Sequence, residues 1–322
     1  MTLSRPWRPL LILLSILGSS SAFAESRQIT DAMDNQVTVP AHPLRIVTLS
    51  ELDLDTVLAL GIEPIGTTNG RGQEAPPHYL EGKISAQTRS VGMLDDPNLE
   101  VLLELQPDLI LTAQTRPELL SILNDIAPTA VTYKFGESWQ TGMQRTADIL
   151  NRAQAGEALL ADYHARTAAA RERLAAHQGE TFSIVRWNPK GPAYMLNDAF
   201  ASRIIQDLGL TRPEQQQQPG TTHSMALSLE SLEKLDAQWL VIGTLSVNGE
   251  AVDAMRQAES TPVFQQLGAI QNGHYRAVDG SLWTSVGGPL AARQVIEDVE
   301  SLLKQQNSQV TASASDDTAA TF

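Results

Sequence analysis

Three arginines stand at the ends of short β-rich runs, where a guanidinium group can bind an anion. Arg71 and Arg116 each follow such a run in the first half of the chain, and Arg186 lies near the end of another in the second half. A guanidinium pairs with carboxylates and other oxygen-rich anions through two parallel hydrogen bonds. Arg89 is a weaker fourth candidate. For each arginine the alternative is a surface ion pair, worth about 0–1 kcal/mol.

Aromatic and hydroxyl side chains follow strand ends in the second half of the chain. Trp187 ends one predicted strand, and Trp283 and Ser285 share a loop near another. Ligands of doubly wound sheets bind outside the carboxyl ends of the strands, so these three residues are candidate contacts. The alternative for a tryptophan is a place in the core, which we predict for Trp139 and Trp239 because they lie on apolar stretches.

The sequence lacks the residues that most enzyme and metal chemistry requires. It has no cysteine, which excludes structural disulfides, thiolate nucleophiles, iron–sulfur clusters and cysteine-based zinc sites. Of its six histidines only His78 and His223 are expected near the candidate loops, and two do not make a metal site. No nucleophile-elbow, zinc-protease or phosphate-loop motif occurs. The net charge of −14 argues against nucleic acid. We predict binding without catalysis, and no resident metal or cofactor.

Two glutamates occupy matching places in the two halves of the chain. Glu100 and Glu230 each stand near the start of a short helical run that leads into an apolar strand. The N-terminus of a helix favours an acidic residue by about 0.3–1 kcal/mol, which alone explains both positions. The alternative is that one carboxylate is exposed on each of two related lobes, where the pair can meet arginines of a two-fold partner.

Alternating strands and helices must position these residues. Apolar runs of four or five residues alternate with helical stretches in both halves, which predicts βα units and mainly parallel sheets. The predicted strands lie at 45–49, 64–67, 108–112, 129–133, 182–187, 239–243 and 276–278. The predicted shorter helices lie at 53–60, 99–105, 200–208, 229–235 and 291–304.

A long alanine-rich stretch without proline separates the two halves. As a helix it would be roughly 36 Å long, enough to cross from one lobe to another. We therefore predict an α/β fold of two βα lobes with mainly parallel sheets, joined by one long interlobe helix. The N-terminal lobe is expected at 25–152, the interlobe helix at 153–177 and the C-terminal lobe at 178–304.

Both ends of the chain are predicted to lie outside the lobes. Residues 1–24 combine two arginines, a short apolar run and a small-residue site ending at Ala24, which is typical of a secretory signal peptide. Cleavage there removes two arginines and no acidic residue, so the net charge changes from −14 to −16. Because no cysteine follows, we expect a chain that is free in the periplasm and not lipid-anchored. Residues 305–322 are predicted to be a disordered tail.

A series of short motifs along the chain resembles one protein family. The motifs are Pro-Leu-Arg-Ile-Val at 43–47, Leu-Ala-Leu-Gly at 58–61, Asn-Leu-Glu at 98–100, Pro-Asp-Leu-Ile at 107–110, Leu-Ser-Leu-Glu at 227–230, Val-Asp-Gly at 278–280 and Gly-Gly-Pro-Leu-Ala at 287–291. Their order and spacing closely resemble the periplasmic iron–siderophore and cobalamin binding proteins of ABC importers, of the ferric siderophore and ferric citrate type. The resemblance covers about residues 28–304.

This resemblance implies a class III periplasmic binding protein, with a shallow cleft between two lobes and small opening motions. It implies that a monomer captures a ferric chelate in the cleft, with no direct bond from protein to iron. It also implies that Glu100 and Glu230 dock the loaded protein onto arginines of a dimeric ABC permease. An outer-membrane receptor system is expected to contribute only indirectly.

The resemblance also bears on single residues of the cleft. Trp283 matches a tryptophan that contacts the ligand in hydroxamate-binding relatives, and Arg116 stands where they use a tyrosine. Leu94 stands where some of them carry an arginine, so citrate-like carboxylate, hydroxamate and catecholate chelators all stay open. One alternative is a cobalamin or haem carrier of the same fold, with His78 or Tyr79 as a haem ligand. Another is a periplasmic sensor subunit that does not transport.

Overall fold

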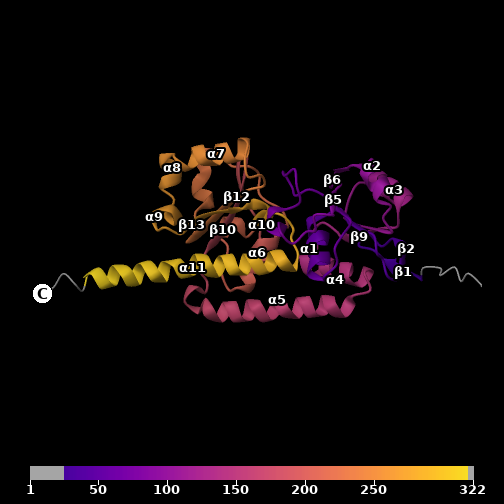
Figure 1. Cartoon of the computed structure of the whole chain (residues 1–322). Helices are drawn as coiled ribbons and strands as arrows, with labels where there is room; N and C mark the ends of the chain where they lie inside the picture. The colour runs from indigo at the N-terminus through magenta and orange to yellow at the C-terminus, as the bar shows by residue number, and fades with distance from the viewer. Residues whose placement is uncertain (1–24, 318–322) are drawn as a thin grey trace, which may run out of the picture.

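The structure, a computed structural model, describes the backbone of residues 25–317 and the side chains of residues 25–304. Two lobes lie side by side, and the long helix α5 (Ala153–Arg173) runs below both of them (Figure 1). Every strand of the first large sheet precedes α5 and every strand of the second follows it. The predicted two-lobed α/β fold with an interlobe helix is therefore confirmed. The predicted signal peptide at 1–24 lies outside the described residues.

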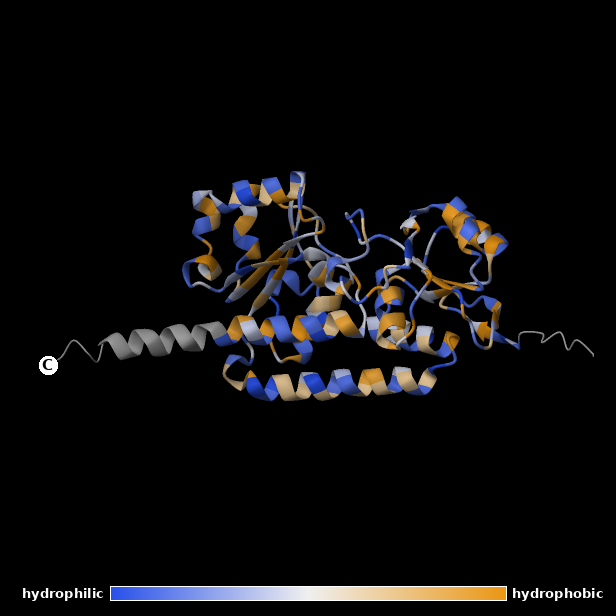
Figure 2. Cartoon of the chain, viewed as in Figure 1, coloured by the Kyte–Doolittle hydropathy of each residue, from blue (hydrophilic) through white to orange (hydrophobic). Residues whose placement is uncertain are grey.

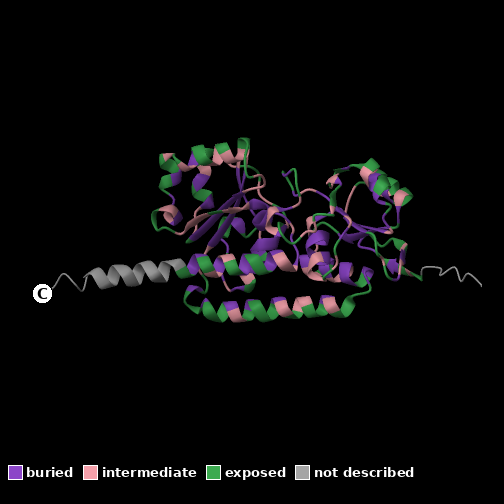
Figure 3. Ribbon diagram, in the orientation of Figure 1, coloured by how far each residue is buried: buried purple, intermediate pink, exposed green. Residues whose placement is uncertain are grey.

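The first lobe is built on a sheet of five parallel strands in the order β5-β4-β3-β8-β9. Its longest strands, β8 and β9, are fully buried and apolar or β-branched, as expected for a parallel sheet (Figure 3). The strands of this sheet are β3 (Ile46–Thr48), β4 (Gly66–Thr67), β5 (Arg89–Ser90), β8 (Leu109–Ala113) and β9 (Thr129–Tyr133). Two antiparallel hairpins complete the lobe: β1 (Ser26–Thr30) with β2 (Gln36–Pro40), and β6 (Gly92–Met93) with β7 (Asp96–Pro97).

Polar caps begin three of the four helices of the first lobe. The side chains of Ser50, Asn98 and Ser138 each accept a hydrogen bond from the backbone N–H three residues later. The helices are α1 (Glu51–Ala59), α2 (Leu99–Leu105), α3 (Pro117–Ile126) and α4 (Trp139–Ile149), with a short 3-10 helix η1 (His78–Leu80). Because of the Ser50 cap, α1 begins two residues before the predicted start and carries Glu51 in its first turn.

The second lobe has a four-stranded sheet in the order β11-β10-β12-β13, parallel except for the β10–β11 pair. Its strands are β10 (Phe182–Asn188), β11 (Gly191–Tyr194), β12 (Trp239–Thr244) and β13 (Tyr275–Asp279). Figure 2 shows hydrophobic residues along its strands. The helices are α6 (Phe200–Asp207), α7 (Glu250–Glu259), α8 (Pro262–Gln265), α9 (Gly268–Gln271) and α10 (Gly280–Thr284), with 3-10 helices η3 (Glu214–Gln216) and η4 (Leu229–Leu235). The helix predicted at 229–235 is thus a 3-10 helix, with non-helical backbone at Ser231.

Two long helices run along the base of the molecule. After α5 a 3-10 turn, η2 (Ala175–His177), replaces the last residues of the predicted interlobe helix. The last helix, α11 (Pro289–Asp317), packs against α5 and α1 and continues past the predicted end at Lys304. The stretch predicted to be a tail is therefore helical as far as Asp317, because it contains no proline or glycine to stop a helix. In the part of the chain that the structure describes, no helix is both long and apolar enough to cross a membrane.

One hydrophobic core is shared by both lobes. Trp139, from α4 in the first lobe, meets Tyr163 of α5 and Phe200 of α6 edge to face, with ring centroids 5.0 Å and 5.9 Å apart. The same cluster continues to Phe182 in the second sheet and to the buried face of α11. Because this core is continuous across the joint between the lobes, the two sheets are held in a fixed arrangement.

A buried carboxylate joins the two lobes at the same place. Asp55 of α1 accepts hydrogen bonds from the backbone N–H groups of Leu290 and Ala291, both at 2.8 Å, and so caps the N-terminus of α11. At Gly288 an added Cβ would stand 2.6 Å from the Asp55 carboxylate, so only glycine fits there. Burial raises the pKa of Asp55 to about 6, although the N–H groups of Gly288, Leu290 and Ala291 oppose that rise.

We predict that Asp55→Asn lowers the free energy of unfolding by about 1–3 kcal/mol. An asparagine keeps one acceptor oxygen but points an NH₂ donor at the second backbone N–H, which leaves that buried donor unpaired. Urea unfolding followed by circular dichroism measures the effect.

The control is Asp125→Asn, an exposed aspartate of α3, which is expected to change stability by less than about 0.5 kcal/mol. Because the pKa of Asp55 is raised on folding, its ionisation costs stability as the pH rises through about 6. The deficit of Asp55→Asn should therefore be larger at pH 5 than at pH 8. If Asp55→Asn and Asp125→Asn had equal free energies of unfolding, the Asp55 cap would not be needed for stability.

Candidate ligand-binding site

A cavity of about 300 Å³ lies between the lobes, at the carboxyl ends of the strands of the first sheet. Its walls come from the segments that follow β3, β4 and β9, the last residue of β8 and the β6–β7 turn in the first lobe, and from β10, the loop at 221–223 and the loop after α10 in the second. The lining includes Glu51, Arg71, Leu94, Asp95, Tyr133, Phe135, Arg186, Thr221, Thr222, His223, Thr284 and Ser285. Ligands of open α/β sheets bind at such strand ends, as the sequence analysis predicts.

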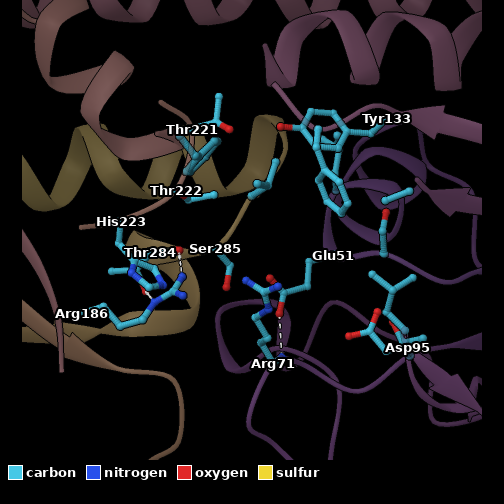
Figure 4. Close-up of a pocket in the computed structure, with 18 of the residues that line it drawn as sticks. Glu51, Arg71, Asp95, Tyr133, Arg186, Thr221, Thr222, His223, Thr284 and Ser285 are labelled. Atoms are coloured by element: carbon cyan, nitrogen blue, oxygen red, sulfur yellow. Dashed lines mark hydrogen bonds between the residues drawn. The ribbon is translucent and has the colours of Figure 1, made fainter. Parts of the chain in front are cut away.

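Arg186 is a fixed cation of the second lobe. Its side chain is buried, and its Nε donates to the Thr284 hydroxyl at 3.0 Å while a terminal nitrogen donates to the Thr284 carbonyl (Figure 4). Burial, and then the charge of Arg71, lower the pKa of Arg186 to about 10, so the guanidinium stays charged at neutral pH. The Thr284 contacts hold this guanidinium at the cavity.

Arg71 faces the same cavity from the first lobe. It is exposed, and no side-chain hydrogen bond or ion pair holds its guanidinium within the described residues. Its loop is nevertheless fixed, because the Gln73 side chain donates to the Leu245 carbonyl of the second lobe at 3.1 Å and Gly72 packs against Leu245. The guanidinium is therefore free to pair with a bound anion.

The negative charge of Glu51 interacts with both arginines. It is half-buried in the first turn of α1, and its Oε1 accepts the backbone N–H of Arg71 at 2.8 Å (Figure 4). Burial raises the pKa of Glu51, while that N–H, the nearby Ser285 hydroxyl and the charges of Arg71 and Arg186 oppose the rise. The Ser285 hydroxyl is itself buried without a hydrogen bond of good geometry, so it can still donate to a ligand.

The uncharged part of the cavity wall has both apolar and polar residues. Leu94, Tyr133 and the largely exposed ring of Phe135 make one apolar side, whereas Thr221 and His223 supply polar groups from the second lobe. His223 bonds the Ser224 carbonyl through Nδ1 at 2.8 Å, so Nδ1 carries the proton there and Nε2 is left as an acceptor. Such a wall suits a ligand that has both oxygen-rich and hydrocarbon parts.

The cavity brings together only some of the predicted ligand residues. Arg71, Arg186 and Ser285 line it. Arg116 does not, but its guanidinium donates at 2.9 Å to the backbone carbonyl of Asp95, which stands on the rim. The placement of Arg89 differs from the prediction: it is half-exposed and pairs with Glu104 at 2.9 Å, the surface ion pair that was its alternative.

The two tryptophans predicted as ligand contacts belong to the core instead. Trp187 packs in the apolar cluster of the second lobe, and its ring is 1% exposed. Trp283, also 1% exposed, stacks on Phe182 with ring centroids 5.9 Å apart and donates to Asp298 at 3.1 Å. A large apolar side chain at a strand end is more stable in the core when the sheet's inner face can accept it. Trp139 and Trp239 are buried, as predicted.

Several lining residues are not among the predicted contacts. Glu51 directly follows the predicted strand at 45–49 and its loop, and this position at a strand end is the signal for it. Tyr133 and Phe135 end a predicted strand and its loop, which is the signal that would have found them. Neither His78 nor Tyr79, the suggested haem ligands, lines the cavity. Across the described residues no three histidine or acidic side chains are arranged to hold a metal ion.

Comparison with known proteins decides the family. The family model described as "periplasmic binding protein" matches residues 46–282, which span both sheets and α5. The chain belongs to the periplasmic binding protein family. This periplasmic binding protein is 30% identical over 291 residues to the probable siderophore-binding lipoprotein YfiY of Bacillus subtilis, covering 88% of this chain and 89% of YfiY.

Two further similarities support the same assignment. The achromobactin-binding periplasmic protein of Dickeya dadantii is 27% identical over 266 residues, which cover 80% of this binding protein and 85% of the relative. The crystal structure of Staphylococcus aureus SirA with staphyloferrin B superposes with a TM-score of 0.73 at 22% identity, covering 86% of this chain and 98% of SirA. At that identity the superposition establishes the fold, and it agrees with the class III architecture.

Proposed function

We propose that this periplasmic binding protein captures a ferric siderophore or another ferric chelate in the cleft and delivers it to an ABC importer permease. The observation that carries the proposal is the pair Arg71 and Arg186, which face one cavity from opposite lobes. The names of YfiY and the achromobactin-binding protein point to the same class of ligand. In this proposal the protein binds and delivers without chemistry of its own, and holds no cofactor.

An iron chelate suits this cavity better than a bare ion. Guanidinium groups recognise the oxygen atoms of a chelate, whereas a bare metal needs several converging histidines and carboxylates. The described residues offer no such cluster. Iron therefore arrives inside its chelator and forms no bond to the protein. The haem alternative loses support because His78 and Tyr79 lie outside the cavity wall.

Delivery depends on Glu100 and Glu230. Both are exposed, both stand second in a short helical segment (after Asn98 in α2 and after Ser228 in η4), and neither forms an ion pair within the described part of the chain. Their carboxylates are thus available to arginines on the two halves of a permease dimer. A periplasmic sensor subunit that does not transport would not need this pair.

We further propose that the mature chain is a monomer, free in the periplasm after loss of residues 1–24. YfiY is named a lipoprotein, which points the other way. The chain of 322 residues contains no cysteine, the residue to which a lipid is attached in such proteins, and this supports the untethered form. An outer-membrane receptor system would supply the chelate only indirectly. The acidic net charge argues against binding of nucleic acid.

Titration with a panel of ferric chelates (citrate, hydroxamate, carboxylate and catecholate types) tests ligand capture. We expect at least one to quench the tryptophan fluorescence of the wild type with saturation. Arg71→Ala should weaken that complex by about ten-fold or more, because a hydrogen-bonded charge pair is worth about 1.5–3 kcal/mol. Arg89→Ala, which removes a half-exposed arginine outside the cavity, is the control and should leave the affinity unchanged. Quenching by cobalamin or haem alone would contradict the proposal.

Delivery is tested by changing the two docking glutamates together. Glu100→Ala with Glu230→Ala should reduce uptake of the iron-labelled chelate at least ten-fold, because docking charges are removed, while the dissociation constant changes less than about two-fold. Glu104→Ala, on the same helix as Glu100 but paired with Arg89, should leave uptake intact. Uptake that survives the double substitution would show that other residues dock the permease.

A further inference from the structure

Three ionisable side chains from both lobes converge at one side of the cavity. Glu51 and Arg71 come from the first lobe, and Arg186 comes from the second (Figure 4). Each arginine acts on Glu51 through its charge, and Arg71 and Arg186 also repel each other. A ligand bound between the lobes therefore meets a group of two cations and one anion rather than two cations alone.

The Glu51 carboxylate is hydrogen-bonded beside this group. It sits in the first turn of α1, one turn before the buried Asp55 cap, and its carboxylate is held by the Arg71 backbone N–H at 2.8 Å. Arg186 is equally fixed by its two bonds to Thr284. The Arg71 guanidinium is the one member that no side-chain bond holds. The anion is thus a built-in part of the cavity wall.

The structural role of Glu51 does not require a negative charge. Its visible structural task is to accept the backbone N–H of Arg71 and so to shape that loop, which a neutral amide oxygen would do equally well. Burying an ionised carboxylate costs free energy that an amide would not cost. Retaining a negative charge beside the two cations that bind the ligand therefore calls for a role in binding.

We propose that Glu51 is the charge filter of the cleft: it offsets one of the two cationic charges, so that the site favours ferric chelates with little or no net negative charge over highly anionic ones. Asp95 adds a second negative charge at the exposed rim of the same cavity, which works in the same direction. The proposal rests on capture of a ferric chelate by this cleft, and names the class of chelate that it selects.

The charge filter predicts that the preference between uncharged and anionic chelates depends on the charge of the Glu51 side chain. Glu51→Gln keeps the size of the residue and an acceptor for the Arg71 N–H, and removes only the charge. Repulsion between Glu51 and a bound anion scales with the charge of that anion and is strong in a partly desolvated cleft. The substitution should therefore strengthen binding of a highly anionic chelate and leave that of an uncharged chelate nearly unchanged.

The test compares two ferric chelates of similar size, uncharged ferrichrome and the triply anionic ferric enterobactin, by fluorescence titration of the full mature chain. The wild type should prefer ferrichrome. Glu51→Gln should bind ferric enterobactin at least about ten-fold more tightly than the wild type and change ferrichrome binding less than about three-fold. Two matched variants are controls: Glu51→Asp keeps the charge and should keep the wild-type preference, and Glu118→Gln, on exposed α3 outside the cavity, should leave that preference unchanged.

The outcomes separate the charge filter from the function on which it rests. If the wild type binds ferric chelates but Glu51→Gln changes the affinity for both probes equally, or for neither, the charge filter is wrong and the proposed function stands. If the wild type binds no ferric chelate at all, the proposed function fails, and the charge filter with it. Thermal melting of each variant, with the wild type alongside, confirms that the compared chains are folded.

Discussion

The contact on which the cleft depends is the Asp55 carboxylate beneath the N-terminus of α11. One helix, α1, carries Glu51 at the cavity and Asp55 at the joint, one turn apart. One segment of the second lobe carries Ser285 at the cavity and the N–H groups of Leu290 and Ala291 at the joint. The ligand site and the joint between the lobes are therefore built from the same two elements, and the shared core behind them leaves little freedom for hinge motion.

The charges of the cleft act locally, against the field of the whole protein. A net charge of −14 repels an anionic ligand at long range, so attraction must come from groups that the ligand touches. Arg186 lines the cavity from a buried position, where its charge is poorly screened, and Arg71 lines it from an exposed one. Glu51 then limits how much negative charge the pair can accept. Selectivity in such a site depends on the balance of the three charges that line it more than on the net charge of the whole surface.

Much of this arrangement is predictable from the sequence, for reasons that differ by residue. The strand at 129–133 and the helix at 99–105 match β9 and α2 because periodic apolar residues dominate there. Arg71 and Arg186 line the cavity because they stand after β4 and near the carboxyl end of β10, where the sheets face the cleft. Arg89 begins β5 and Trp283 lies in α10, and their partners Glu104 and Phe182 are brought to them only by the tertiary fold. Partners distant in sequence decide between surface, core and site, and no local pattern encodes them.

The single passage of the chain through α5 also has a consequence for the order of assembly. Each large sheet is made from one uninterrupted stretch of sequence, so the first can pair all of its strands while residues beyond α5 are still being synthesised. The Asp55 cap forms later, because the backbone N–H groups that it accepts lie 235 and 236 residues further along the chain. The cap can therefore close only when nearly the whole chain is present, and its closure brings together the two elements that carry Glu51 and Ser285.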